Sequence, residues 1–396
     1  MKFYVIGIDD NRHPYLPPKV MEIVQSHRIF SGGVRHHEIV KQYLPDNSFW
    51  IPIVVPLDDV FQQYDDWEEI VVFASGDPLF FGFANTIRRL RPDAALQVFP
   101  YFNSLQLLAH RLLLPYQEMH IVSLTGRPWP KLDKALLEGM AMIGVLTDNK
   151  QHTPSSIARR MLDYGYDNYR MHIGELLGND EDEKVSTWDL KEVIDREFQF
   201  PNNLILEKTA SRPRPLGIPE GDFHLLNGRA KMITKMPIRL LSLSVLDLRD
   251  KNVFWDVGFC TGSVSVEAKL QFPHLDIYAF EIRPEGKDLM ESNMRRFGTP
   301  GIEYLIGDFL LQDVSAIPRP EAVFIGGHGG KLVDIVGKIS DVLAADGVIV
   351  FNSVSEESRR LFLEAVEKYK LTLEQDMHIR LDEFNPIDVM KARKKG

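Results

Sequence analysis

The residues best suited to hold a ligand lie in the stretch 252–270, which reads NVFWDVGFCTGSVSVEAKL. A predicted strand at 253–257 contains Asp256, a turn follows between Gly258 and Gly262, and a helical pattern begins at residue 263. Glycines let the backbone turn sharply and approach a ligand that a Cβ would keep away. The first amides of the next helix then face that ligand. Strand, glycine-bearing turn and helix together indicate the opening unit of a nucleotide-binding α/β sheet.

Later strand ends indicate the kind of ligand. The predicted strand at 275–280 is followed by Glu281, about 20 residues past the turn, where a carboxylate can accept hydrogen bonds from ribose hydroxyls. That spacing fits both NAD and S-adenosylmethionine (SAM). Asp308 after a strand at 303–306, and the glycine cluster in EAVFIGGHGG at 321–330, favour SAM, because they leave room for an adenine and a methyl acceptor. The alternative is that these are ordinary strand ends of a doubly wound sheet.

Length and composition limit the class of protein. A chain of 396 residues predicts two or three domains. The formal charge of −10 argues against a duplex nucleic-acid binder. The single cysteine, Cys260, excludes an internal disulfide and a cysteine-rich metal site, and no other metal-ligand spacing appears, so we expect no bound metal. Asp9 and Asp10 interrupt the first apolar run, and no run has transmembrane length. We expect a soluble cytoplasmic protein that binds neither nucleic acid nor membrane.

Two successive βα series precede the glycine turn. The first has predicted strands at 3–8, 70–74 and 96–99 and helices at 18–26, 84–90 and 104–114. The second has strands at 120–124, 144–147, 169–176 and 203–206 and a helix at 155–163. We interpret SGGVRHH at 31–37 as a flexible basic loop and the acidic run 179–183 as a solvated turn. The segment 208–227 has prolines and glycines without periodicity, which indicates a linker at a domain boundary.

The order of motifs resembles the fused precorrin-6Y C5,15-methyltransferases (decarboxylating) of cobalamin biosynthesis. The N-terminal half is similar to the tetrapyrrole methylase family in VIGI, SGGVRHH, VVFASGDPLFFG, NSLQLLAHRLLLP, VSLTGRP, LTDNKQHTPSSIA, GELLGNDEDEKV and PNNLIL. The C-terminal half is similar to its partner methyltransferase in MITKMPIRLLSLSVLDL, VFWDVGFCTGSVSVEA and FIGGHGG, and the linker's GIPEGDF matches the family junction.

The resemblance implies an α/β fold with two domains. A tetrapyrrole-methylase domain of two α/β subdomains would occupy residues 1–207. A linker would follow at 208–228, and a Rossmann-like class I SAM-dependent methyltransferase domain at 229–396. Because the related C-terminal partners are oligomeric, we expect a homo-oligomer, with a tetramer built through the C-terminal domain.

The resemblance also implies an activity. The N-terminal half would methylate precorrin-6Y, or its cobalt form, at C5. The C-terminal half would methylate C15 and decarboxylate the acetate side chain on C12. Transfer of a methyl group from a sulfonium requires mainly that carbon, methyl and sulfur be held in line, so we expect no nucleophilic triad.

The resemblance assigns candidate residues to the cofactor. In the C-terminal domain they are Thr234 and Lys235 beside the methionine carboxylate, Asp256, Gly258 and Gly262 along the methionine, Glu281 at the ribose and Asp308 at the adenine edge. In the N-terminal domain they are, by family position, Gly76, Asp77, Leu79, Phe80, Ser104, Leu124 and Leu176.

Other candidates are expected at the tetrapyrrole. Basic residues suit a substrate with many carboxylates, although each could equally be a surface ion-pair partner. They are Arg35, His36, His37, Arg127 and Arg239, and Gly326, Gly327 and His328 are expected nearest the methyl acceptor. The catalytic candidates are Asp77 and His328. His328 is either a proton donor or acceptor after decarboxylation or an ordinary loop histidine.

Three departures from the family pattern leave alternatives open. The first loop, at 7–11, reads GIDDN where the family has Gly-x-Gly-Pro-Gly, so the N-terminal half is either catalytic or a module that only binds tetrapyrrole. Cys260 replaces a glycine, and Thr-Lys-x-Glu ends here in Pro237. The rival function is SAM-dependent methylation of RNA or another small molecule. The acidic balance counts against RNA, and the matched N-terminal half counts against both.

Overall fold

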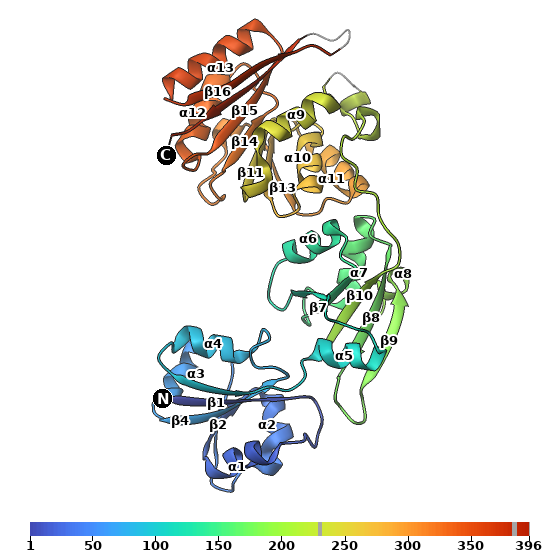
Figure 1. Cartoon of the computed structure of the whole chain (residues 1–396), viewed down its shortest axis with the longest axis vertical. Coiled ribbons are helices and arrows are strands. Elements are labelled where there is room, and N and C mark those ends of the chain that lie inside the picture. Colours follow the sequence, from blue (N-terminus) through green and yellow to red (C-terminus); the bar gives the residue numbers. More distant parts are fainter. Residues whose placement is uncertain (229–231, 382–385, 396) are drawn as a thin grey trace. The chain divides into compact units, whose positions relative to one another are not determined.

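The computed structural model describes residues 1–228, 232–381 and 386–395. Contacts between backbone segments divide the chain into two compact units. The first contains Met1–Pro128, Met140–Arg160 and Asn168–Ala210, and the second contains Trp129–Gly139, Met161–Asp167 and Ser211–Gly396. The strands form two sheets of five and one of seven, with helices beside each (Figure 1). The predicted α/β class is therefore confirmed.

The first sheet, here called sheet A, is entirely parallel. Its elements are β1 (Lys2–Ile8), α1 (Pro18–Ser26), β2 (Ile29–Gly32), α2 (Val34–Val40), β3 (Phe49–Pro52), α3 (Leu57–Tyr64), β4 (Glu69–Ser75), α4 (Phe83–Leu90) and β5 (Ala95–Phe99). The strand order is β3-β2-β4-β1-β5. Helices α1 and α2 pack on one face, and α3 and α4 on the other (Figure 1). Strands covered on both faces are continuously apolar, which is why the sequence signals β1 and β4 strongly.

The second sheet, sheet B, is mixed. Its strands are β6 (His120–Ser123), β7 (Met142–Leu146), β8 (Tyr169–Glu175), β9 (Lys184–Asp189) and β10 (Asn202–Lys208), and the helices of this part of the chain are α5 (Ser104–Leu112), α6 (Pro130–Glu138), α7 (Pro154–Asp163) and α8 (Leu190–Val193). The order is β6-β7-β10-β8-β9, with only β6 and β7 parallel. The acidic run 179–183 lies in the turn between β8 and β9, as predicted.

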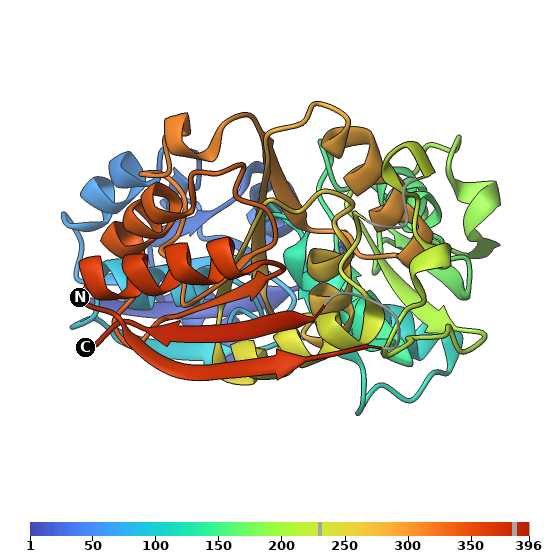
Figure 2. The same cartoon turned by 90° about the horizontal axis from the view of Figure 1, so that it is seen from above.

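The third sheet, sheet C, follows the glycine turn. Its elements are α9 (Met236–Leu246), β11 (Val253–Val257), α10 (Ser263–Gln271), β12 (Asp276–Glu281), α11 (Gly286–Phe297), β13 (Ile302–Ile306), β14 (Ala322–Ile325), α12 (Leu332–Val342), β15 (Val348–Ser353), α13 (Glu356–Lys368), β16 (Thr372–Ile379) and β17 (Ile387–Arg393). Five strands are parallel in the order β13-β12-β11-β14-β15, and β17 and β16 continue the sheet as an antiparallel pair, drawn in red in Figure 2. Helices α9, α10 and α11 pack on one face, and α12 and α13 on the other (Figure 1).

Sequence and structure differ most at residues 31–37. We expected a flexible basic loop, which is wrong, because Ser31 and Gly32 end the buried strand β2 and Arg35 lies in the first turn of α2. The Ser31 hydroxyl is fully buried and hydrogen-bonds to the carbonyl oxygen of Ile51 at 2.7 Å. Only two apolar residues, Ile29 and Phe30, precede the serine and the two glycines. A hydrophobic pattern of two residues is too short to predict a strand. Strand β9, with the sequence KVSTWD, was also missed, because it contains only two apolar residues.

A buried ion pair fixes the start of the C-terminal sheet. The Arg239 guanidinium is fully buried, and its Nε lies 2.5 Å from Oε2 of Glu267, also fully buried. Arg239 also donates to the carbonyl oxygens of Thr234 and Ile218, and Glu267 accepts from the backbone N–H of Gly217. The prediction that Arg239 lies at a cleft mouth and contacts substrate is therefore wrong. Its positive charge balances a buried carboxylate instead.

No described helix is both long and apolar enough to span a bilayer.

Replacement of Arg239 tests the importance of this ion pair. The variant Arg239→Met leaves the Glu267 carboxylate buried without its cation, so the free energy of unfolding should fall by about 3–5 kcal/mol. Urea unfolding followed by circular dichroism measures the loss. The matched control is Arg295→Met, which breaks an exposed pair with Glu291 and should cost less than about 1 kcal/mol. Equal losses in the two variants would contradict this account, and adding Glu267→Gln to Arg239→Met should restore part of the loss.

Candidate active sites

A cavity of about 240 Å³ lies at the carboxyl ends of the parallel strands of sheet C. The first strand, β11, has β12 on one side and β14 on the other, so this edge is the point where the strand order reverses. Ligands of open α/β sheets bind at such points. Eight of the predicted residues line the cavity: Thr234, Asp256, Gly258, Glu281, Asp308, Gly326, Gly327 and His328.

Two predicted cofactor residues, Lys235 and Gly262, are not among the lining residues. Gly262 instead supplies the left-handed residue that begins α10, with φ of +74°, and a Cβ there would lie 2.5 Å from the Sδ of Met290. Its role is thus in the shape of the turn. The sequence reasoning also missed lining residues, among them Lys331 and Arg283. Lys331 directly follows the glycine cluster, and Arg283 lies two residues after the strand-ending acid Glu281; these positions are the signal that could have found both.

Gly258 and Gly327 form the narrowest backbone approach in this site. Gly258 has φ of +78°, and a Cβ on it would lie 2.5 Å from both the backbone nitrogen and the oxygen of Gly327. Hydrogen bonds tie each loop to a neighbouring strand of the sheet, from Gly258 N–H to Phe280 O at 2.7 Å and from Gly326 N–H to Val257 O at 2.8 Å. Only glycine fits at position 258, as the sequence pattern predicts.

Asp256 places an incompletely paired carboxyl group beside this turn. Its Oδ2 accepts from the Ser265 hydroxyl at 2.6 Å and from the Ser265 N–H at 3.2 Å. Its Oδ1 is buried without a hydrogen-bond partner in the part of the chain that the structure describes. Burial raises the pKa of Asp256 to about 7, and the nearby charge of Glu281 acts in the same direction. A buried acceptor without a partner fits a site that receives a donor group from a ligand.

Glu281 supports the glycine turn as well as lining the cavity. Its Oε2 accepts from the N–H of Cys260 at 2.8 Å, and its Oε1 accepts from the N–H of Arg283 at 3.0 Å. Cys260 has φ of +52°, a conformation in which glycine is usual, so this hydrogen bond helps to hold the strained residue. Each carboxylate oxygen can accept a further hydrogen bond, which leaves Glu281 able to bind ribose hydroxyls.

Asp308 and His328 lie on the remaining sides of the cavity. Asp308 accepts from Lys331 Nζ at 2.8 Å, and that hydrogen bond, with a second from the Leu310 N–H, lowers the pKa of Asp308. His328 Nδ1 accepts from the N–H of Gly330 at 3.2 Å, so the proton of the neutral ring is on Nε2. Burial lowers the pKa of His328, which keeps the ring neutral near pH 7. His328 is therefore a neutral donor at the cavity wall.

In the N-terminal unit, the predicted cofactor residues follow strand ends of sheets A and B. Gly76 has φ of +59° and donates to Ile8 O at 2.7 Å, and a Cβ there would lie 2.8 Å from the Cα of Asn103. Asp77 accepts from the N–H of Leu79 at 2.8 Å, which forms the expected turn. Of the other candidates, Leu79 is exposed, Phe80, Ser104 and Leu176 are half-buried, and Leu124 is fully buried.

The basic candidates of this unit already have partners. Arg35 lies 3.2 Å from Oδ1 of Asp10, and His37 stacks on Trp50 with ring centroids 4.4 Å apart. Arg127 lies over the ring of Phe81 at 4.9 Å, and both side chains are exposed. Ion-pair and stacking partners do not prevent a further contact, because Arg35 and Arg127 keep unused N–H groups on an accessible surface.

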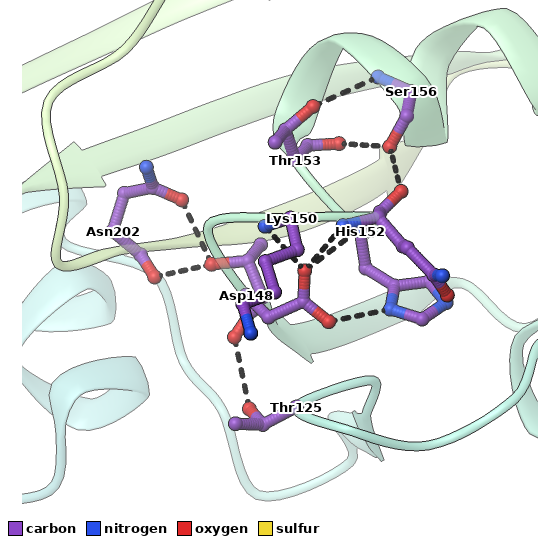
Figure 3. Close-up of polar contacts among 9 residues, drawn as sticks. Thr125, Asp148, Lys150, His152, Thr153, Ser156 and Asn202 are labelled. Carbon is purple, nitrogen blue, oxygen red and sulfur yellow. Dashed lines mark hydrogen bonds and ion pairs between the residues drawn. The ribbon is translucent and has the colours of Figure 1, made fainter.

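The loop after β7 is held by a single carboxylate, as Figure 3 shows. Asp148 Oδ1 accepts from the backbone N–H groups of Lys150, Gln151 and His152 at 2.8–2.9 Å, and its Oδ2 lies 2.7 Å from Nδ1 of His152. These hydrogen bonds lower the pKa of Asp148 well below its usual range. The Thr125 hydroxyl adds a hydrogen bond to the Thr147 carbonyl at 2.9 Å. Internal hydrogen bonds therefore define the conformation of this part of the LTDNKQHTP motif.

Comparison with known proteins relates both halves to one pathway. A family model described as Precorrin methyltransferase domain matches residues 227–394, and one described as Tetrapyrrole (Corrin/Porphyrin) Methylases matches residues 2–194. Precorrin-6Y C(5,15)-methyltransferase (decarboxylating) of Sinorhizobium sp is 27% identical over 363 residues, 91% of this chain and 86% of that protein. Cobalt-precorrin-6B C(15)-methyltransferase (decarboxylating) of Salmonella typhimurium is 35% identical over 133 residues, 34% of this chain and 68% of that protein. The chain belongs to the precorrin-6Y C5,15-methyltransferase (decarboxylating) family.

A solved structure from this family is also similar. The crystal structure of precorrin-6y C5,15-methyltransferase from Geobacter metallireducens GS-15 is 30% identical, covers 47% of this chain and 100% of that chain, and has a TM-score of 0.42.

The described residues contain no group of three or more His, Cys, Asp or Glu side chains placed to hold a metal ion.

The raised pKa of Asp256 predicts a specific pH dependence of stability. Its folded pKa of about 7 lies above the ordinary value of about 3.9, so the folded state holds a proton that the unfolded chain releases. The stabilisation is complete below about pH 4 and is lost as the pH rises to about 7. The variant Asp256→Asn cannot ionise, so without SAM its stability relative to the native protein should rise over this range, by an amount on the order of a few kcal/mol.

Urea unfolding at a series of pH values measures this difference. The control is Asp250→Asn, which changes an exposed aspartate and should follow the native pH profile. A profile for Asp256→Asn that stays parallel to the native one would show that Asp256 titrates normally.

Proposed function

We propose that this chain methylates precorrin-6Y, or its cobalt form, at C5 and C15 and decarboxylates the C12 acetate. It is an enzyme of the precorrin methyltransferase class and uses SAM. The observation that carries the C-terminal assignment is the cavity in which a buried oxygen of Asp256, without a partner among the described residues, adjoins the contact of Gly258 with Gly327. A positively charged group of a small ligand fits beside that oxygen, and the glycines keep the space open.

The two activities are proposed for separate domains. C5 methylation is assigned to residues 1–207, and C15 methylation with decarboxylation to residues 229–396. The residues 208–228 between them form the proposed linker. Its later part packs on the C-terminal sheet, because Ile218 and Phe223 are buried in the same cluster as Phe254.

The residues of the C-terminal cavity fit SAM by their chemistry. Asp256 would face the methionine ammonium, Glu281 the ribose hydroxyls and Asp308 the adenine edge. Thr234 borders the same cavity, and Lys235 follows it in the chain. Bound SAM supplies an electrophilic methyl group. The protein's part is to hold the acceptor carbon in line with that group and to exclude water.

Decarboxylation needs a proton at the carbon that loses carbon dioxide. The C–C bond of the acetate breaks, its electron pair stays on the methylene carbon, and one proton converts that carbon to methyl. His328 lines the cavity with its Nε2 proton available, because its Nδ1 is occupied by the Gly330 N–H. A neutral imidazole is too weak an acid to release this proton, so we assign His328 the role of a hydrogen-bond donor that positions the acetate, and solvent supplies the proton.

One observation favours a second candidate for the N-terminal half. The first loop carries Asp9 and Asp10 at the carboxyl edge of sheet A, and burial raises the pKa of each. Carboxylates at that edge are unfavourable for a polycarboxylate substrate unless they are paired or protonated. Because this loop departs from the family's Gly-x-Gly-Pro-Gly pattern, the alternative is an N-terminal half that binds tetrapyrrole without methylating it.

Three further expectations belong to this proposal. The protein is a homo-oligomer, with a tetramer formed through the C-terminal domain. It acts in the cytoplasm. It has no nucleic-acid partner, and the acidic charge of −10 supports this.

Mass spectrometry of the product separates the two candidates. The native protein, SAM and precorrin-6Y should yield a product with two added methyl groups and one carbon dioxide lost. In Asp77→Ala the turn that presents the Leu79 amide is lost, so C5 methylation should slow by about 100-fold while C15 methylation and decarboxylation continue. The matched control, Asp93→Ala, alters an exposed aspartate of the same unit and should behave like the native protein.

Other outcomes have definite meanings. A native product with one methyl added and carbon dioxide lost would favour the binding-only N-terminal half. No product from precorrin-6Y or from its cobalt form would refute the proposed function.

A further inference from the structure

Two basic side chains converge on one hydroxyl at the carboxyl edge of sheet A. Ser75, the last residue of β4, is exposed. Its Oγ lies 3.0 Å from Nη2 of Arg35 and 2.9 Å from Nε2 of His36. Ser75 belongs to none of the candidate groups discussed so far.

The tautomer of His36 follows from a backbone contact. The N–H of Gly33 points at Nδ1 of His36 at 3.2 Å, and an N–H can only donate, so Nδ1 carries no proton. Burial lowers the pKa of His36 to about 4, with the charge of Arg35 acting in the same direction. The ring is therefore neutral near pH 7, its one proton is on Nε2, and that proton is donated to Ser75.

The direction of the Ser75 hydroxyl follows in turn. Arg35 has only donors, so its Nη2 also donates to Oγ of Ser75. A serine oxygen accepts two hydrogen bonds and donates one, and both acceptor positions are now occupied. Over the described ranges, no acceptor for the hydroxyl proton is recorded beside Ser75. The proton must therefore be offered to solvent or to a ligand.

An ion pair with Asp10 holds the Arg35 side chain in place. Nη1 of Arg35 lies 3.2 Å from Oδ1 of Asp10, whose side chain is only 9% exposed, whereas that of Arg35 is 41% exposed. Asp10 anchors one side of the guanidinium and leaves its other N–H groups accessible. A hydroxyl with a fixed donor direction beside an accessible guanidinium suits an anionic acceptor, most simply a carboxylate.

We propose that Ser75 donates a hydrogen bond to a carboxylate of the bound ligand, and that His36 and Arg35 are positioning residues that orient its hydroxyl. This inference rests on the proposed function, which supplies a tetrapyrrole with many carboxylates. It also changes the expected role of His36, which has no free nitrogen to offer the substrate. The methionine carboxylate of SAM is the second source of the same chemistry, because Gly76 and Asp77 follow Ser75 directly.

Steady-state kinetics of C5 methylation by the full-length protein tests this inference. Ser75→Ala removes the donor, so the KM for one carboxylate ligand should rise by about tenfold. A rise for precorrin-6Y assigns the carboxylate to the tetrapyrrole, and a rise for SAM assigns it to the cofactor. Ser75→Thr keeps the hydroxyl and should stay within about threefold of the native KM. Rates of C15 methylation and decarboxylation in the same samples report on folding and should not change.

Two further variants separate orientation from simple packing. His36→Phe keeps a ring but removes both nitrogens, so the Ser75 proton is no longer directed outward and the same KM should rise. In the double variant with Ser75→Ala, His36→Phe should cause no further rise. The control Ser26→Ala changes an exposed serine at the end of helix α1, whose hydroxyl donates to Ile23 O in the same helix, and it should have the native KM.

The results that overturn the inference are distinct from those that overturn the proposed function. If the native protein methylates C5 and Ser75→Ala leaves both KM values unchanged, Ser75 is not a carboxylate donor and only the inference is wrong. Additive effects of Ser75→Ala and His36→Phe would also overturn it. If the native protein does not methylate C5, the N-terminal assignment and the inference both fail.

Discussion

The cavity of the C-terminal domain depends on the contact between two glycine backbones where sheet C reverses its strand order. A side chain on Gly258 would overlap the backbone of Gly327. Because β11 and β14 are paired in the sheet, the loops that follow them must meet at this edge. The contact between these two loops determines where the surrounding polar groups lie. Asp256 and Glu281 are both buried beside this turn. Burial raises the pKa of Asp256, and Glu281 holds the turn by accepting from the N–H of Cys260.

The sequence could predict features that depend on local pattern. Parallel strands buried on both faces are continuous apolar runs, and ligand groups follow their carboxyl ends, so the positions of Asp256, Glu281 and Asp308 could be derived from spacing. The bounds of the elements that were predicted differ from those of the structure by at most two residues. The glycine requirement at position 258 was also visible, because a turn between a strand and a helix needs it.

What the sequence could not predict depends on contacts between distant residues. Arg239 has the residue type of a carboxylate-binding side chain, but its partner Glu267 is 28 positions away and both are buried. Whether an arginine is a surface ligand or half of an internal ion pair is decided by packing. Ser75 presents the opposite case. A serine at a strand end carries no signal, and its role emerges only when His36, 39 residues away, is seen to donate to it.

Charged side chains have different partners in the two halves, and the difference concerns the loop at residues 7–11. In the C-terminal cavity, Lys331 is the cation of an ion pair with Asp308. Burial raises the pKa of Asp256 to about 7 and lowers the pKa of His328. At the edge of sheet A, one acid of the GIDDN loop accepts a backbone hydrogen bond and the other forms an ion pair. Asp9 accepts from the N–H of Asn11 at 3.1 Å, and Asp10 anchors Arg35. Asp10, where the family has proline, thus adds a counter-ion for Arg35. The same loop departs from the family pattern and holds Arg35 beside Ser75. The departure is therefore compatible with an active site.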